Sequence, residues 1–277
     1  MARKRTGERT TLPVNAVAFT VMWIGGLVVL PTLGNVQLSD FTQNWQLYLL
    51  AALSFVAALA LLYRASSHLE SATVSVLGTS NAIFTLILAG IIYGERLTTG
   101  QIIGSSLLLP CIWYMALLAR SHHRMLKVKD LKSVSWLKGV GLVLLSSLAM
   151  SIGHILEKKI FENSSVGSYV AFGWMLEVMM AWILVFMFSY KSINVLRQKS
   201  LVLGAAKLGI LRIGAGLCFF YAIKAQQNIS LLTIIINFRI IIVAVLAGWL
   251  LNERRFYYRK LIAAVLSVVA LSIVFWS

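Results

Sequence analysis

Residues 88–96, LAGIIYGER, recur at residues 246–254 as LAGWLLNER, with the same Leu-Ala-Gly start and the same Glu-Arg end. The two stretches lie 158 residues apart, and this offset also places Tyr63 on Tyr221. An internal repeat in a strongly apolar chain indicates a membrane protein that arose by duplication. Because such repeats usually meet at a binding site near the middle of the bilayer, the pattern favours a transport protein.

The composition places the chain in a membrane. Of its 277 residues, 59% are hydrophobic and 12% are charged, and the mean hydropathy is +0.85. A soluble protein of this size could not hide so much apolar surface. We therefore expect an all-α, multi-pass protein, integral to the inner or plasma membrane. Since a spanning helix needs about 20 apolar residues, the sequence predicts nine, at about 13–33, 45–63, 70–93, 100–119, 137–157, 168–189, 201–223, 229–251 and 259–276.

The positive charge follows the predicted topology. The chain carries 25 Lys and Arg residues and a formal net charge of +16, and most of these residues fall in alternate loops. This bias is the positive-inside signal, which sets the orientation of the helices during insertion. Attraction to anionic lipid is a secondary effect. The charge therefore gives no reason to expect a nucleic-acid partner.

The repeat divides the predicted spans unequally. The 158-residue offset maps each of the first four spans onto a span of the second half, whereas 137–157 has no partner. Since the first repeat starts one helix late, equivalent helices run in opposite directions and the repeats are inverted. We expect a first repeat of four helices at 1–119, a basic cytoplasmic linker at 120–136 and a second repeat of five helices at 137–277.

The repeated turns resemble a known family. Residues 94–96 (GER) and 252–254 (NER) each join two apolar helices, and residues 146–159 (SSLAMSIGHILEKK) are similar to the helix that opens the family's second repeat. This pattern resembles the EamA-like branch of the drug/metabolite transporter superfamily. The resemblance implies ten helices in two inverted five-helix repeats that move small metabolites by alternating access. This chain departs from that pattern because the first helix is lacking.

Three ionisable residues fall near the middle of predicted spans: Glu177, Arg212 and Arg239. Each costs about 2.5–3.5 kcal/mol at the bilayer centre on insertion scales, so we expect a reason for its presence. One interpretation is a cavity whose arginines bind a carboxylate or phosphate, with Glu177 balancing an arginine or carrying a coupling proton. The other is a structural salt bridge from Glu177 to one of the two arginines.

Uncharged polar residues agree with such a cavity. Ser147, Ser151 and His154 follow one another at helical spacing, so they share one face of the span 137–157. Thr79 and Asn237 occupy equivalent positions of the two repeats. The predicted substrate-binding residues are the three ionisable residues together with His154, Thr79 and Asn237. Serine and threonine also bond to their own helix, which is the structural alternative.

Two further features have a structural and a functional interpretation. Tyr63 and Tyr221 end equivalent spans, where aromatic residues often mark the membrane surface, although they could also gate the cavity. Gly214, Ala215 and Gly216 form a small-residue patch beside Arg212, and we expect close helix packing there.

Three functions are weighed. The first is a secondary transporter for a small anionic or zwitterionic metabolite, with proton coupling as an option. The second is a flippase for lipid-linked substrates. The third is a non-transporting membrane subunit that needs a partner, either a second copy or another chain, to fill the missing helix position. No nucleophile–base pair, glycine-rich phosphate loop or metal-ligand cluster is recognisable, so we expect neither an enzyme nor a cofactor.

Overall fold

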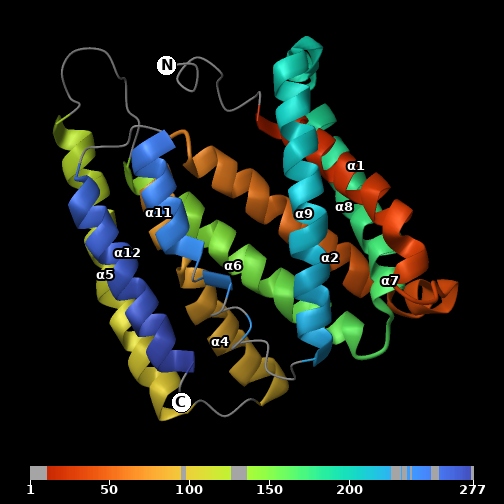
Figure 1. The fold of residues 1–277 in the computed structure, drawn as a ribbon, viewed down its shortest axis with the longest axis horizontal. Helices are drawn as coiled ribbons and strands as arrows, with labels where there is room; N and C mark the ends of the chain where they lie inside the picture. Colours follow the sequence, from red (N-terminus) through yellow and green to blue (C-terminus); the bar gives the residue numbers. More distant parts are fainter. Residues whose placement is uncertain are drawn as a thin grey trace. The chain divides into compact units, whose positions relative to one another are not determined.

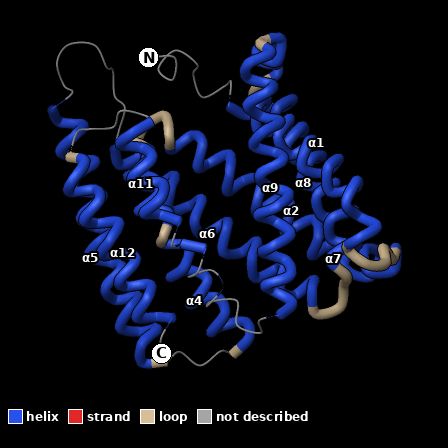
Figure 2. Tube along the Cα trace, viewed as in Figure 1, coloured by secondary structure: helices blue, strands red, loops and turns tan. Residues whose placement is uncertain are grey.

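The computed structural model describes residues 11–94, 98–125, 136–225, 232, 236–237, 239–250 and 256–275. Within these ranges every regular element is a helix (Figure 1, Figure 2). The elements are α1 (Thr11–Val29), η3 (Leu30–Thr32), α2 (Leu38–Ala65), α3 (Ser71–Gly78), α4 (Ser80–Tyr93), α5 (Thr99–Met125), α6 (Trp136–Phe161), α7 (Val166–Ser168), η4 (Tyr169–Gly173), α8 (Trp174–Phe188), η5 (Tyr190–Arg197), α9 (Lys199–Ala225), α11 (Arg239–Leu250) and α12 (Tyr257–Phe275).

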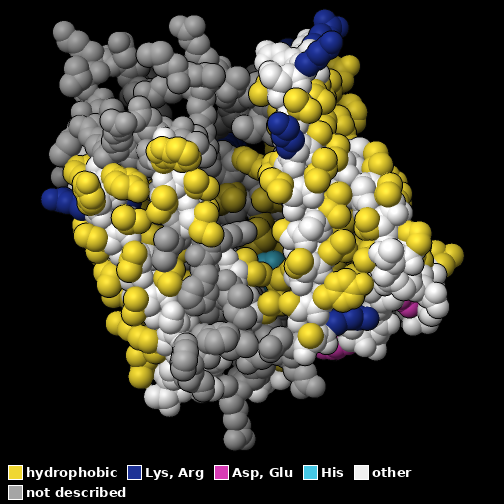
Figure 3. Space-filling view, in the orientation of Figure 1, with side chains coloured by type: hydrophobic (Ala, Val, Ile, Leu, Met, Phe, Trp, Pro, Cys, Tyr) yellow, Lys and Arg dark blue, Asp and Glu magenta, His cyan; other side chains and the backbone are white. Residues whose placement is uncertain are grey.

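Seven stretches of the described chain are long and apolar enough to cross a bilayer. They match the first seven predicted spans, α11 lies within the eighth, and α12 overlaps the ninth. Hydrophobic side chains cover much of the described helix surface (Figure 3), and Trp113 and Trp249 are 68% and 78% exposed. Surfaces of this kind are stable against lipid tails and unstable in water. The chain is an integral, multi-pass membrane protein, whereas the count of nine stays a prediction.

The helices form two compact units. The first unit comprises Met1–Ala57 and Ile152–Gln227, and the second comprises Ala58–Ser151 and Asn228–Ser277. Helices α2 and α6 each contribute one part to each unit. Every unit therefore combines residues from both halves of the sequence, and the division into repeats at 1–119 and 137–277 stays a prediction.

Glycines set the packing of the first unit, in which α1 lies against α8 and α9. The Trp174 indole is buried beside Gly26 and Gly216, where an added Cβ would come within 2.5 and 2.9 Å of the ring. Gly209 lies against the Ala18 carbonyl oxygen, which a Cβ would approach to 2.6 Å. The predicted patch is wrong for Gly214, because no described atom lies within 4 Å of its Cβ position. Close packing instead uses Gly209 and Gly216.

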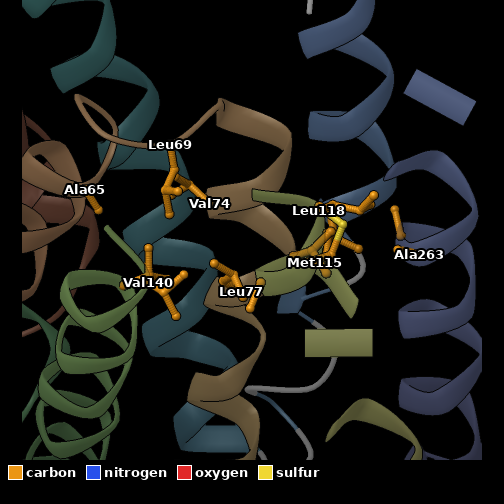
Figure 4. Packing of buried hydrophobic residues seen from close by; sticks show 13 residues of the cluster. Ala65, Leu69, Val74, Leu77, Met115, Leu118, Val140 and Ala263 are labelled. Atoms are coloured by element: carbon orange, nitrogen blue, oxygen red, sulfur yellow. The ribbon is translucent and has the colours of Figure 1, made fainter. Parts of the chain in front are cut away.

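The second unit has an apolar core built from helices far apart in the sequence. Helix α5 packs along α12, and α3 packs against α5 and α11. Figure 4 shows part of this core, whose buried residues include Leu69, Leu77, Met115, Val140 and Ala263. The core thus supports α3 and the beginning of α6.

The predicted span 70–93 is broken in the structure. Helix α3 ends at Gly78, Thr79 is the cap residue of both helices, and α4 begins at Ser80. The Thr79 amide donates to the Val76 carbonyl oxygen at 3.1 Å, and the Thr79 side chain donates to the same oxygen at 2.7 Å. These bonds replace part of the regular helical ladder, so the span is interrupted between Gly78 and Ser80.

Candidate functional site

Arg212 is held inside the first unit by helix α1. Its Nη2 donates to Asn15 Oδ1 at 2.9 Å, and its guanidinium lies over the Phe19 ring, 4.8 Å from the ring centre. Asn15 is buried, four residues before Phe19, so one face of α1 supplies both contacts. A charge-assisted hydrogen bond and a cation–π contact together orient the guanidinium.

Two buried acids accompany Arg212 in the first unit. Glu177 on α8 is 5% exposed and interacts electrostatically with Glu157 and with Arg212. Glu157 on α6 is 3% exposed. The structure therefore brings the predicted residues Glu177 and Arg212 into one polar cluster. Glu157, which the sequence interpretation placed at the end of a span and passed over, is a third member.

His154 joins the same cluster through Glu157. Its Nδ1 lies 3.3 Å from Glu157 Oε2, and its ring contacts Phe55 and Phe219 at centroid distances of 5.3 and 4.7 Å. The spacing of three residues on α6 makes this contact local. The cluster, named here the charge cluster, consists of Asn15, His154, Glu157, Glu177 and Arg212.

A π-helical turn adjoins the charge cluster. Tyr169 in η4 is fully buried, its ring contacts Tyr48, Phe161 and Phe220, and it interacts electrostatically with Glu157 and Glu177. Such turns widen a helix by one residue and occur often at functional sites. Tyr169 is a polar residue that the sequence analysis missed, because no pattern in a single sequence signals a π-helical turn.

The second unit contains a half-open cavity of about 390 Å³ next to the break between α3 and α4. Among the predicted residues, Tyr63, Ser147 and Asn237 lie in its wall. The full lining is Leu59, Leu62, Tyr63, Ser66, Ser71, Val74, Ser75, Gly78, Asn81, Ser146, Ser147, Met150, Asn237, Ile240 and Val243.

Serines of α6 bind the backbone around this cavity. Ser151 Oγ donates to the Asn81 carbonyl oxygen at 2.8 Å, and Ser147 Oγ contacts the Gly78 carbonyl oxygen at 3.4 Å. Ser146 Oγ donates to the Ala58 carbonyl oxygen on α2 at 2.6 Å. Carbonyl groups freed by a helix break need such partners within a membrane. The predicted polar face of α6 therefore stabilises the break, and Ser146 and Ser147 also line the cavity.

An amide pair spans the cavity wall. Asn237 Nδ2 donates to Asn81 Oδ1 at 2.8 Å, and both residues are buried. Asn81 was missed as a site residue, although the 158-residue offset maps it onto Arg239. Thr79 is fully buried and is not a lining residue, since its hydroxyl donates to Val76.

The other predicted residues are placed less completely. Arg239 begins α11, two residues after Asn237, but its side chain lies outside the described residues. Tyr63 lines the cavity of the second unit, whereas Tyr221 lies on α9 in the first unit and is 48% exposed. Their role as gates stays a prediction.

The first repeated turn is partly described. Gly94 ends α4 with φ of +64°, a left-handed conformation that glycine adopts without strain. Residues 95–97 and 251–255, which hold the repeated Glu-Arg pairs, lie outside the described residues.

Within the described ranges, no three His, Cys, Asp or Glu side chains come together as metal ligands would.

An ion pair in the second unit joins Lys260 Nζ, at the start of α12, to Glu70 Oε2, just before α3. Lys260 is 2% exposed, so the lysine side of this ion pair is buried.

Comparisons with known proteins bear on the family of residues 4–117 and on the fold of the chain. The model of the EamA-like transporter family matches residues 4–117. The comparison with curated protein sequences finds no relative. One crystal structure of a protein is similar over 96% of this chain and 87% of its own length, with 15% identity and a TM-score of 0.66, and this likeness concerns the fold alone. The resemblance inferred from the repeated turns is confirmed over residues 4–117, where the chain matches the model of the EamA-like transporter family.

Proposed function

We propose that this protein is a secondary transporter that moves a small anionic or zwitterionic metabolite by alternating access. We further propose that nine spans form two inverted repeats of four and five helices, as the 158-residue offset indicates. The family match supports a membrane transport function. The charge cluster of the first unit supports the type of substrate.

The observation that carries the proposal is the position of Arg212 beside buried acids. Its guanidinium is oriented by Asn15 and Phe19, and Glu177 and Glu157 lie in the same cluster. A guanidinium binds a carboxylate through two parallel hydrogen bonds, and nearby carboxylates attract a substrate ammonium group. A site that offers both signs of charge suits a zwitterion best.

Burial supports a functional interpretation of these charges. Removing a charge from water costs free energy that a salt bridge often fails to recover. Residues of this kind inside a membrane usually mark a substrate or ion pathway. Arg239 keeps its predicted role in binding the substrate on sequence grounds, and Glu177 keeps its predicted role in balancing an arginine or carrying a coupling proton.

The test is transport by purified protein in proteoliposomes. A panel of radiolabelled metabolites is screened by counterflow with the wild type, followed by Arg212→Gln and, as a matched control, Arg197→Gln. Arg197 is exposed at the end of η5. We expect Arg212→Gln to lower the transport rate at least about tenfold, the effect of losing roughly 1.4 kcal/mol of binding, whereas the control retains the wild-type rate.

Equal transport rates of Arg212→Gln and Arg197→Gln would show that Arg212 does not bind the substrate. If the wild type transports none of the metabolites while lipid-linked substrates cross the vesicle membrane, the flippase alternative replaces the proposal. If the pure protein is inactive and regains activity with a co-purified membrane subunit, the partner-subunit alternative replaces it.

A further inference from the structure

The cavity of the second unit differs chemically from the charge cluster of the first. Its polar side chains are serine, asparagine and tyrosine, and none of the lining side chains that the structure describes is charged. Six of its side chains are aliphatic or thioether groups, namely Leu59, Leu62, Val74, Met150, Ile240 and Val243. Charged groups are poorly solvated in such surroundings, whereas an apolar group gains from burial there.

Most of the polar groups already have partners in the protein. Ser66 Oγ donates to the Leu62 carbonyl oxygen at 3.0 Å, and Ser146 Oγ donates to Ala58. Each hydroxyl has one proton to donate, so these two protons are occupied. Ser147 Oγ contacts the Gly78 carbonyl oxygen in the same way. These serines shape the wall and leave little donor capacity for a ligand.

Asn81 keeps donor capacity toward the cavity. Its Oδ1 accepts from Asn237 Nδ2, which leaves the two N–H groups of its own Nδ2. The Ser151 bond to the Asn81 carbonyl oxygen holds its backbone at the helix break. The residue therefore offers an amide donor, held from two sides, to a group inside the cavity.

We propose that this cavity is a binding site for an uncharged, amphipathic part of a solute. A carbonyl or similar acceptor of the solute accepts from Asn81 Nδ2, and a branched aliphatic group packs against Leu62, Ile240 and Val243. The inference rests on the proposed function in that the ligand is a solute of the transport cycle. It adds a site separate in composition from the charge cluster, together with the chemistry that this site selects.

Three matched probes test the proposal by calorimetric titration of the full-length protein in nanodiscs. N-acetylleucinamide is uncharged and has an isobutyl side chain. N-acetylglycinamide lacks that side chain, and N-acetylglutamate α-amide replaces it with a carboxylate. We expect N-acetylleucinamide to bind at least about tenfold more tightly than N-acetylglycinamide, since each buried methylene contributes about 0.8 kcal/mol. The glutamate compound should show no saturable binding.

Two variants on α11 localise the binding. Val243→Phe places an aromatic ring in the cavity, whereas Ile242→Phe makes nearly the same change on a side chain that is 62% exposed. We expect Val243→Phe to abolish binding of N-acetylleucinamide and Ile242→Phe to preserve it. Asn81→Ala should weaken binding about tenfold. If Asn81→Ala does not fold, Val243→Phe and Ile242→Phe still test whether N-acetylleucinamide binds in the cavity.

The proposal is overturned if N-acetylleucinamide does not bind the wild type, if it binds no more tightly than N-acetylglycinamide, or if both phenylalanine variants bind it equally. These outcomes do not depend on the result of the transport assay, so the cavity assignment and the proposed function can fail independently. Metabolite counterflow that depends on Arg212 while the probes fail would overturn the cavity assignment alone. Probe binding that depends on Val243 in a protein without transport activity would overturn the proposed function alone.

Discussion

At the scale of single residues, the charge cluster depends on a few specific partners. Arg212 could be predicted as unusual from its place within an apolar span, but Asn15, its hydrogen-bond acceptor, lies 197 residues away in the chain. A lone asparagine near the start of a span carries no signal of its own. The partner of a buried charge is therefore decided by packing, and the sequence reveals only that a partner is needed.

This contact gives a prediction for Asn15→Ala. Hydrogen bonds to charged groups contribute about 1.5–3 kcal/mol, so the substitution should lower the free energy of unfolding by that amount. Asn163→Ala, at an exposed loop position between α6 and α7, should change it by less than about 0.5 kcal/mol. Reversible denaturation in mixed micelles measures both. Equal stability of the two variants would show that Asn15 does not hold Arg212.

At the scale of helices, close packing depends on which glycines face a neighbour. The sequence places Gly209, Gly214 and Gly216 on one span, and small residues there predict a tight contact. Only the structure tells which sides of α9 meet α1 and α8, and it places Gly209 against Ala18 of α1 and Gly216 against Trp174 of α8. A rotation of α9 about its own axis by about a few tens of degrees would bring other residues to these contacts. The hydropathy of the sequence does not specify this rotation.

Gly209→Ala and Gly214→Ala make the same change five residues apart. The new Cβ at Gly209 would come within 2.6 Å of the Ala18 carbonyl oxygen, so α1 and α9 must separate, at a cost of about 1–3 kcal/mol. The methyl group at Gly214 meets no described atom within 4 Å and should be neutral or stabilise the helix by up to about 1 kcal/mol. Thermal unfolding monitored by tryptophan fluorescence compares them, and a larger loss for Gly214→Ala would contradict the packing described.

At the scale of the whole molecule, the loop charges predict the orientation in the membrane. The positive-inside bias predicts that the linker 120–136 is cytoplasmic and that the loop after α6 is outside. Helix α6 has 26 residues and is about 39 Å long at 1.5 Å per residue, which is sufficient to cross a bilayer. The two ends of this helix should therefore be accessible from opposite sides.

Single cysteines test this orientation in a background that lacks Cys111 and Cys218. Ser133→Cys lies in the linker, and Asn163→Cys lies in the loop after α6. In intact cells a membrane-impermeant maleimide should label Asn163→Cys only, and both should react after lysis. Labelling of Ser133→Cys alone in intact cells would show the opposite orientation. Labelling of both Ser133→Cys and Asn163→Cys would contradict a single membrane crossing between the two positions.

The sequence by itself determined the class of the protein, the approximate position of the first seven spans and the presence of buried charges. These properties are local or additive, because transfer free energy sums over a segment of about 20 residues. The tertiary structure alone decided the break at Gly78 and Thr79, the π-helical turn at Tyr169, the pairing of Asn81 with Asn237 and the acceptor of Arg212. Each of these features depends on contacts between side chains of helices that are distant in the sequence. The rotation and packing of the helices determine which side chains make contact, and the hydropathy of the sequence does not specify either.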